Sequence, residues 1–164
     1  MSIENEFTSA REAANDPRIL VFGRLLGAAN RLEYILGHAL EERVGLSHSI
    51  FELLLVVGRA GPGGIAARDI AQARVLTSGG ATRLVNRAVE QGLITRRTSD
   101  TDARVQLIEL TPHGEEVLLQ ASTLHAHNIQ RYLLDVLPAD QAESFARAIR
   151  TLSKSAAQAL PLMP

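Results

Sequence analysis

Residues 76–111 read LTSGGATRLVNRAVEQGLITRRTSDTDARVQLIELT, and this stretch decides the fold. Its first part predicts a helix over about 78–91, with Thr77 as the N-cap and Gly92 as the stop. Leu93–Arg97 and Val105–Leu110 then read as strands, joined by the polar turn Thr98–Arg104. A short amphipathic helix followed by a hairpin favours a winged helix-turn-helix.

The sequence on either side of this stretch predicts helices, because apolar residues recur there at intervals of three and four. The helix starts and stops are marked by Pro17, Gly45, Ser47, Thr111 and Pro138. Residues 1–16 are expected to be weakly ordered, and the glycine-rich 61–64 breaks the chain. The predicted elements are helices at 17–44, 48–60, 69–74, 112–136 and 139–159, and a short strand at 65–67.

The resulting fold class is mainly α with a small β-hairpin: a winged helix-turn-helix reading head plus long N- and C-terminal helices. We expect residues 1–164 to form a single domain. Within it, 47–111 would be the winged helix-turn-helix, and 17–45 and 112–159 would be dimerisation helices. The outer helices carry apolar stripes too long for the small central unit to cover, so a second copy of the chain is the expected partner.

The composition excludes several kinds of protein. Apolar residues make up 46 % of the 164 residues, but aromatic residues only 4 %. There are no cysteines, which excludes disulfides, thiolate metal sites and thiol-based redox sensing. The N-terminus is polar and acidic, and no apolar run approaches the roughly 18 residues that span a bilayer. The expectation is a cytoplasmic protein without a membrane partner.

Charge is distributed unevenly, although the net charge is only −1. Residues 68–104 hold seven Arg and four acids, whereas the segments before and after them each carry an excess of two acids. Positive charge is therefore concentrated in the stretch that contains the predicted helix and hairpin. This placement favours double-stranded DNA as the partner, because phosphate contacts are made by arginine and lysine.

The predicted helix has the two faces that a helix in a major groove needs. One face is apolar, and the other carries small or hydrogen-bonding residues: Ser78, Gly79, Thr82, Arg83, Asn86 and Arg87. Gly79 permits close approach, Ser78 and Thr82 suit phosphates, and the longer side chains suit base edges or phosphates. Arg96, Arg97 and Arg104 gather at the hairpin. Taken alone, each feature also fits a merely solvated surface, and a winged helix can instead serve as a protein-interaction module.

From about Pro17 to Ala159 the chain resembles the multiple antibiotic resistance regulator (MarR) family of winged helix-turn-helix transcription factors. The motifs that carry this resemblance are residues 76–97, the Asp102-Ala103-Arg104 element, and LIELTPHGEEVL at 107–118. The family often has a Ser or Thr cap where this chain has Ala66-Ala67-Arg68, so the preceding short helix has a weaker start and Arg68 becomes a phosphate-contact candidate.

The resemblance implies an obligate homodimer that binds a pseudo-palindrome with half-sites about one helical turn apart. It implies that residues 78–87 read the major groove, that Arg104 enters the minor groove, and that Asp102 orients an arginine of the hairpin. The complete set of predicted DNA-binding residues is Arg68, Ser78, Gly79, Thr82, Arg83, Asn86, Arg87, Arg97, Asp102 and Arg104.

The functional hypothesis is a ligand-responsive repressor with a small-molecule effector, for which an anionic aromatic compound anchored by Arg24, Arg31 or Arg59 is one candidate. A metal-responsive regulator is an alternative, with His38 and Glu41 as half of a site. His125 and His127 are two residues apart on a predicted helix and therefore point in different directions. No catalytic, phosphate-binding or dinucleotide-binding motif is present, so neither an enzyme nor a cofactor is expected.

Overall fold

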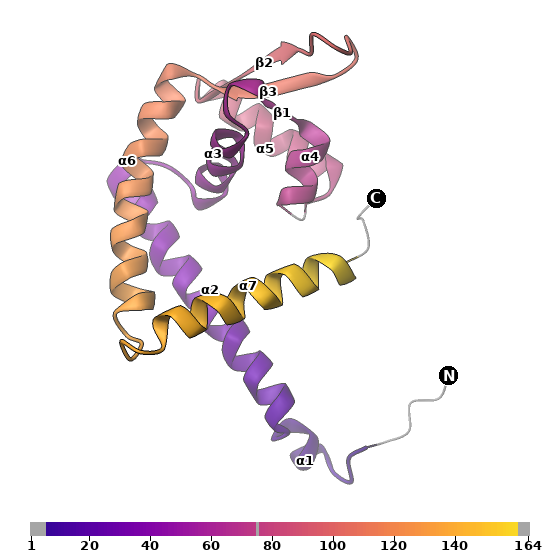
Figure 1. The fold of residues 1–164 in the computed structure, drawn as a ribbon, viewed down its shortest axis with the longest axis vertical. Coiled ribbons are helices and arrows are strands. Elements are labelled where there is room, and N and C mark those ends of the chain that lie inside the picture. The colour runs from indigo at the N-terminus through magenta and orange to yellow at the C-terminus, as the bar shows by residue number, and fades with distance from the viewer. Residues whose placement is uncertain (1–5, 75, 161–164) are drawn as a thin grey trace. The chain divides into compact units, whose positions relative to one another are not determined.

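The computed structural model describes residues 6–74 and 76–160 (Figure 1). Its helices are α1 (Ala10–Ala14), α2 (Pro17–Val44), α3 (His48–Ala60), α4 (Ala67–Ala73), α5 (Ser78–Glu90), α6 (Pro112–Ile129) and α7 (Ala142–Ala159). Its strands are β1 (Ile65–Ala66), β2 (Ile94–Thr98) and β3 (Gln106–Leu110). The mainly helical fold with a small sheet confirms the predicted class.

The chain divides into two compact units, residues 1–35 and 36–164, and the division falls inside α2. In the first unit, the expectation of weak order over residues 1–16 is wrong for α1. Ser9 caps this helix, since its Oγ accepts a hydrogen bond from the backbone N–H of Glu12 at 3.2 Å. Residues 1–5 lie outside the described residues.

Helix α2 begins and ends where the sequence predicts. Asp16 precedes it and accepts hydrogen bonds from the backbone N–H and the guanidinium of Arg18, at 2.8 and 2.9 Å. These hydrogen bonds lower the pKa of Asp16 to about 2. Gly45 ends the helix at φ 70°, a conformation that favours glycine.

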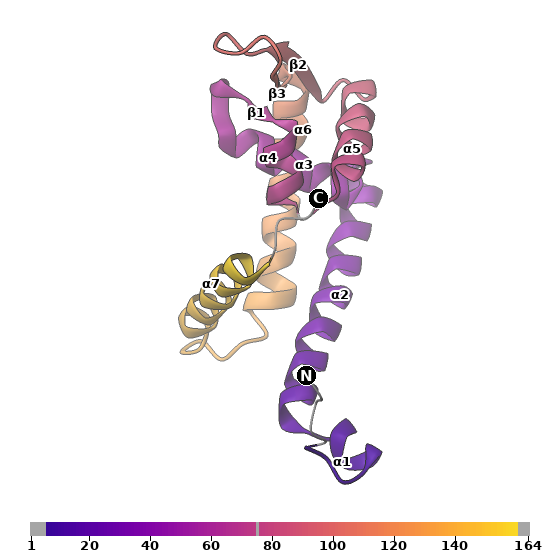
Figure 2. The ribbon, with the colours of Figure 1, turned by 90° about the vertical axis from the view of Figure 1, so that its right-hand side faces the viewer.

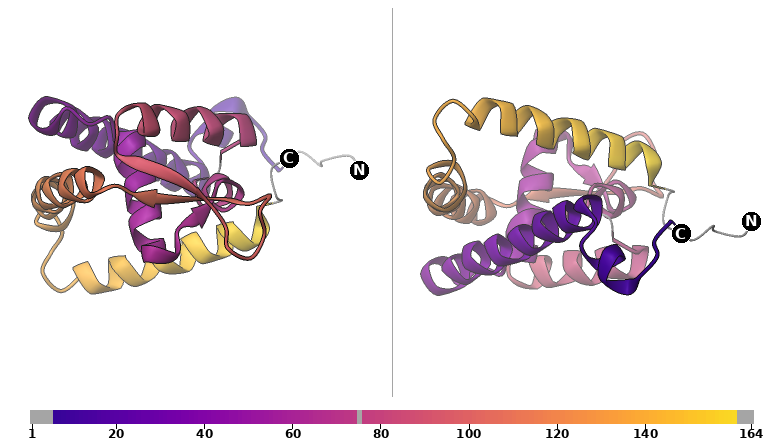
Figure 3. Two further views of the ribbon diagram at one scale, coloured as in Figure 1. Left: turned by 90° about the horizontal axis from the view of Figure 1, so that it is seen from above. Right: turned by 90° about the horizontal axis from the view of Figure 1, so that it is seen from below.

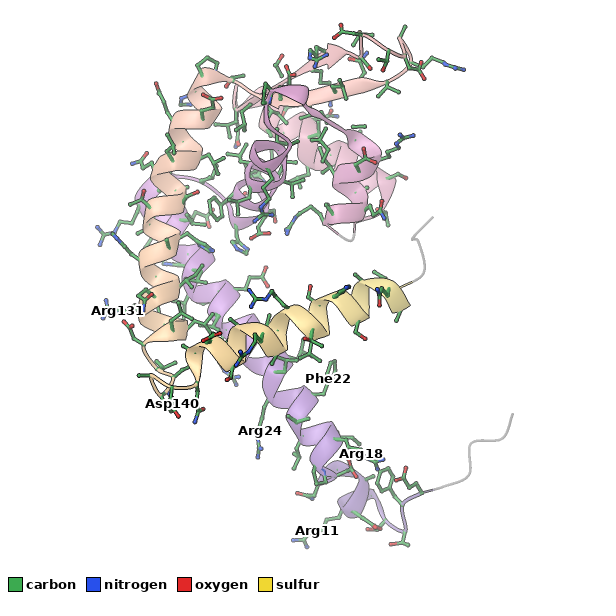
Figure 4. The ribbon with its side chains drawn as sticks, viewed as in Figure 1. Arg11, Arg18, Phe22, Arg24, Arg131 and Asp140 are labelled. Carbon is green, nitrogen blue, oxygen red and sulfur yellow. The ribbon has the colours of Figure 1, made fainter. Side chains whose placement is uncertain are left out.

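The first unit leaves large apolar side chains of α2 exposed. They are Ile19, Val21, Phe22, Leu25, Leu26 and Ile35, and 64 % of the Phe22 surface is accessible. Figure 4 shows Phe22 and Arg24 projecting from opposite sides of the helix. The first unit by itself therefore does not cover this apolar surface.

The core of the second unit is built around α3. Its Ile50, Phe51, Leu53, Leu54 and Val57 are all buried. They pack with buried residues from six other elements: Leu40, Ile70, Val85, Ala88, Ile94, Ile108 and Ala121. Figure 2 shows α3, α4 and α5 grouped below the strands. The core is aliphatic apart from one phenylalanine, as the composition predicts.

One predicted cap differs from the structure. Ser47 occupies the N-cap position of α3, but it makes no capping hydrogen bond through its side chain. Its Oγ is buried and has no hydrogen-bond partner among the described residues. The residue type therefore located the start of the helix correctly, although the mechanism inferred from it was wrong.

The sheet has three antiparallel strands in the order β1-β3-β2, so the predicted short strand joins the hairpin. Ile65 pairs with Ile108, while on the other side of β3 Ile94 pairs with Leu110 and Arg96 with Ile108. Figure 3 shows the hairpin from above, with α5 alongside it. The sheet thus ties the hairpin to the turn that follows α3.

Thr111 joins the hairpin to α6. Its Oγ1 accepts a hydrogen bond from the N–H of Gly114 at 2.9 Å and donates one to the carbonyl of Gly92 at 2.6 Å. The sequence predicts an α-helix to about Val136, but the α-helical hydrogen bonding of α6 ends at Ile129. Gln130–Leu134 is π-helical, and the N–H of Asp135 donates to the carbonyl of Gln130. The final helix, α7, has no buried residues.

Candidate nucleic-acid interface

Helix α5 is fixed at its start by Thr77 and along one side by the core. The Oγ1 of Thr77 accepts a hydrogen bond from the N–H of Gly80 at 3.1 Å, which confirms the predicted cap. Ala81, Val85 and Ala88 are buried on the inner face. A helix of 13 residues is about 20 Å long. Packing along most of its length therefore sets the orientation of the helix, and its outer face is directed to solvent.

The outer face of α5 is exposed and contains all six of the predicted contact residues on this helix: Ser78, Gly79, Thr82, Arg83, Asn86 and Arg87. A Cβ added at Gly79 would meet no atom of the chain within 4 Å, so the missing side chain serves no internal packing. The hydroxyl of Thr82 donates to the carbonyl of Ser78 at 2.9 Å. Thr82 must therefore rotate before its hydroxyl can donate to a phosphate.

The two hairpin arginines named as contact residues differ in availability. Arg97 donates to Glu109 at 2.7 Å, to Asp100 at 3.4 Å and to the carbonyl of Gly63 at 3.3 Å, and only 35 % of its side chain is exposed. The hydrogen bond to Glu109 raises the pKa of Arg97. Arg97 therefore ties the hairpin to the turn after α3.

Arg104 is 93 % exposed at the end of the hairpin, far more than Arg97. Asp102 accepts a hydrogen bond from the backbone N–H of Arg104 at 3.0 Å, and its carboxylate lies 3.4 Å from Nε of the same residue. The arginine beside Asp102 is thus Arg104 itself. This contact orients the Arg104 side chain at the tip of the hairpin.

Arg96 has a contact that the sequence analysis did not identify. Its Nη2 donates a hydrogen bond to Oδ1 of Asn86, so a β2 side chain contacts the outer face of α5. Side chains alternate along a strand, and Arg96 therefore leaves β2 on the same face as the buried Ile94. This alternation was the available signal, because it separates Arg96 from Arg97.

Arg68 stands at the start of α4, where Ala66 occupies the N-cap position without a side-chain hydrogen bond, as predicted. Its side chain is 82 % exposed, and its Nε lies 3.4 Å from the carboxylate of Asp69. The side chain is accessible to a ligand, although a neighbouring acid offsets part of its charge.

Residues 44–105 match the model of the MarR family. Over this stretch, which is less than half of the chain, the sequence is similar to the MarR family. The match begins at the last residue of α2 and ends within the turn of the hairpin, so it includes α5 and β2. No match is found among curated proteins.

Several solved structures of MarR proteins share the fold over most of this chain. Sco3205 from Streptomyces coelicolor, a MarR family transcriptional regulator in complex with DNA, is 24 % identical, with 94 % of this chain and 92 % of that chain covered and a TM-score of 0.76. AbsC from the same organism gives 18 % identity, 92 % and 97 % coverage and a TM-score of 0.74. A mutant of E. coli MarR in complex with operator DNA is 21 % identical, with 82 % of this chain and 95 % of that chain covered and a TM-score of 0.71.

The predicted effector residues are divided between the two units of the chain. Arg24 and Arg31 lie in the first unit and Arg59 in the second, and Arg31 donates to the carbonyl of Gly27 at 2.9 Å. Nδ1 of His38 lies 3.3 Å from Glu42. Within residues 6–74 and 76–160, no group of three or more His, Asp or Glu side chains is arranged to hold a metal ion.

His125 of α6 packs against α3, with its ring centroid 4.7 Å from that of Phe51 and 5.8 Å from that of His48. Its Nδ1 is buried and has no hydrogen-bond partner in the described part of the chain. Burial lowers the pKa of His125, nearby His48 lowers it further, and Glu52 acts in the opposite direction. The structure thus favours a neutral imidazole at this position.

In the described ranges, no single helix is long and apolar enough to cross a membrane. Only α2 taken together with His48–Gly63, across a bend of 87°, reaches that length and composition.

Proposed function

We propose that this protein is a ligand-responsive transcriptional repressor that binds a pseudo-palindromic operator in double-stranded DNA as a homodimer in the cytoplasm. The observation that carries the proposal is the outer face of α5. One side of this helix is held in the core, while the other exposes small, polar and cationic side chains over a length of about 20 Å. A major groove about 12 Å wide admits such a helix.

The hairpin supports the same proposal, because it supplies cationic side chains next to α5. In the proposed complex, Arg104 enters the minor groove and Arg68 contacts a phosphate, while Ser78, Gly79, Thr82, Arg83, Asn86 and Arg87 meet the major groove. Arg97 and Asp102 contribute through the conformation of the hairpin, given their contacts with Glu109 and Arg104. The DNA-bound structures of Sco3205 and E. coli MarR are similar in fold.

The homodimer is supported by apolar surface that the described protomer leaves exposed. Ile19, Phe22 and Leu26 of α2 and Ile149 and Leu152 of α7 are large, apolar and accessible. We propose that 17–45 and 112–159 form the dimerisation helices of a single domain, with 47–111 as the winged helix-turn-helix. A two-fold axis would then place the two α5 helices about 34 Å apart on successive turns of the duplex.

Regulation by a small-molecule effector would act on that separation. Such a ligand binds the dimer more tightly at one spacing of the two α5 helices than at another. The ratio of these two ligand affinities limits how far the ligand can change the affinity for DNA. An anionic aromatic effector anchored by arginine remains a candidate, although the three arginines named for this role are divided between two units of the chain.

A salt-dependent binding assay tests the proposal. Fluorescence anisotropy would follow binding of the full chain to duplexes tiled from the DNA upstream of its own gene. We expect saturable binding whose affinity falls steeply between 50 and 200 mM salt, by roughly a thousandfold for about six phosphate contacts. Sedimentation of the same sample should give a dimer. A monomer that binds none of these duplexes at low salt would refute the proposal and favour a protein-interaction module.

A further inference from the structure

The contact between Arg96 of β2 and Asn86 of α5 affects which groups the interface offers to DNA. A guanidinium has only hydrogen-bond donors. The atom of Asn86 that faces it must therefore be the carbonyl oxygen Oδ1, and this chemistry fixes which end of the amide is which. Since Oδ1 is directed at the hairpin, the amide NH₂ of Asn86 is left for an outside partner.

We propose that Arg96 is a specificity-determining residue that restricts Asn86 to donating hydrogen bonds to a base edge. This inference rests on the proposed function, because it assigns a role on DNA. An unrestrained asparagine recognises adenine by accepting from N6–H₂ and donating to N7 at the same time. With one lone pair of Oδ1 held by Arg96 and this oxygen turned toward the hairpin, accepting from N6–H₂ would need the second lone pair in a direction fixed by that contact, whereas the NH₂ is free to donate. Asn86 then suits positions with major-groove acceptors, above all guanine with N7 and O6.

The position of Arg96 in the sheet explains why it can act in this way. Arg96 lies opposite Ile108, on the face of the sheet that also carries the buried Ile94. Its side chain therefore leaves the sheet toward the helices, and its head group reaches the exposed face of α5. Arg97, the next residue, leaves on the other face and is occupied by Glu109. The two adjacent arginines thus have separate tasks.

The charge of Arg96 strengthens the same preference. Arg83 and Arg87 are exposed on α5 close to Asn86 in sequence, and Arg96 brings a third guanidinium to this face. Cationic donors on the same exposed face as Asn86 favour the acceptor-rich edge of guanine, and they disfavour the N6–H₂ donor of adenine. Hydrogen bonding and electrostatics therefore act in the same direction.

The test measures base preference rather than affinity alone. Duplexes would be selected from a randomised pool by the full chain and by the Asn86→Ala variant, and the base position at which the variant loses its preference is assigned to Asn86. Relative affinities for guanine and adenine at that position are then measured by anisotropy for the parent chain, Arg96→Ala and Arg96→Met. Both substitutions remove the guanidinium that donates to Asn86. Arg96→Met keeps most of the side-chain length, so it serves as the second variant if Arg96→Ala perturbs folding.

We expect the parent chain to prefer guanine, and both Arg96 variants to shift the ratio toward adenine by roughly tenfold, near the lower end of what a good bidentate pair discriminates. In an Asn86→Ala background, Arg96→Ala should leave the ratio at this position unchanged. Thr95→Ala is the matched control, since Thr95 is exposed on the opposite face of β2 and should leave the preference as it is.

Two results would overturn the inference. One is an Arg96→Ala variant that weakens all duplexes equally, because this would reduce Arg96 to an electrostatic or structural residue. The other is an Asn86→Ala variant with unchanged base preferences throughout. In both cases the parent chain still binds DNA, so these failures differ from that of the proposed function, in which the parent chain binds no duplex.

Discussion

Gly114 allows α6 to start directly against the end of the hairpin, and Gly114→Ala should strongly destabilise the protein. A Cβ at this position would lie 1.9 Å from the carbonyl oxygen and 2.8 Å from the carbonyl carbon of Leu93. These are backbone atoms, and the same carbonyl accepts a hydrogen bond from the N–H of Thr111 at 3.1 Å. Neither partner can move without disturbing the junction between the hairpin and α6.

The size of the effect follows from two opposing contributions. Forcing an extra carbon into a packed site costs about 1–3 kcal/mol and sometimes more, and a clash with backbone belongs at or above the upper end. Alanine recovers roughly 0.5–1 kcal/mol in a helix. We therefore expect the free energy of unfolding to fall by about 2–3 kcal/mol. For a chain of this size that corresponds to a fall in Tm of roughly 4–12 °C.

The assay is urea unfolding followed by far-ultraviolet circular dichroism, at one protomer concentration because association contributes to apparent stability. Gly79→Ala is the matched control. It is the same substitution in the first turn of α5, where the added Cβ meets nothing within 4 Å, so stability should rise by about 0.5–1 kcal/mol. If Gly114→Ala is as stable as the parent while Gly79→Ala behaves as expected, the packing argument at Leu93 is wrong.

Three further predictions concern the hairpin and His125 of α6. Arg104→Ala should weaken binding to all duplexes and reduce the slope of log affinity against log salt by about 1, and an unchanged slope would contradict its contact with DNA. Glu109→Gln should cost less than about 1 kcal/mol of stability, because the ion pair is partly exposed, yet lower DNA affinity by loosening Arg97; equal affinity would argue against this anchoring role. Because burial lowers the pKa of His125, the unfolded chain binds more protons below the ordinary value of 6.5, and stability should fall as pH decreases from 7.5 to 5.5. His125→Gln should make the urea midpoint less dependent on pH, whereas an identical pH dependence would show that other groups cause it.

Local signals were sufficient for most of the element boundaries. Pro17, Thr77 and Thr111 mark helix starts and Gly45 and Gly92 mark helix ends, because each acts on its own turn of backbone. Two of the departures, at Ser47 and in α6, have a common reason. The side chain of Ser47 turned out to be buried without a partner, and α6 changes to π-helical hydrogen bonding at Gln130. Neither outcome depends on local residue preference alone.

The sequence by itself determined the winged helix-turn-helix, the exposed face of α5 and the concentration of arginine near it, because helical and strand periodicity and charge are properties of neighbouring residues. Only the tertiary structure decided what each hairpin arginine does. Arg96 reaches Asn86, Arg97 reaches Glu109, and Arg104 extends into solvent. Strand pairing and packing against α5 bring together groups that are distant in sequence. A local sequence pattern therefore does not predict which acceptor each guanidinium contacts.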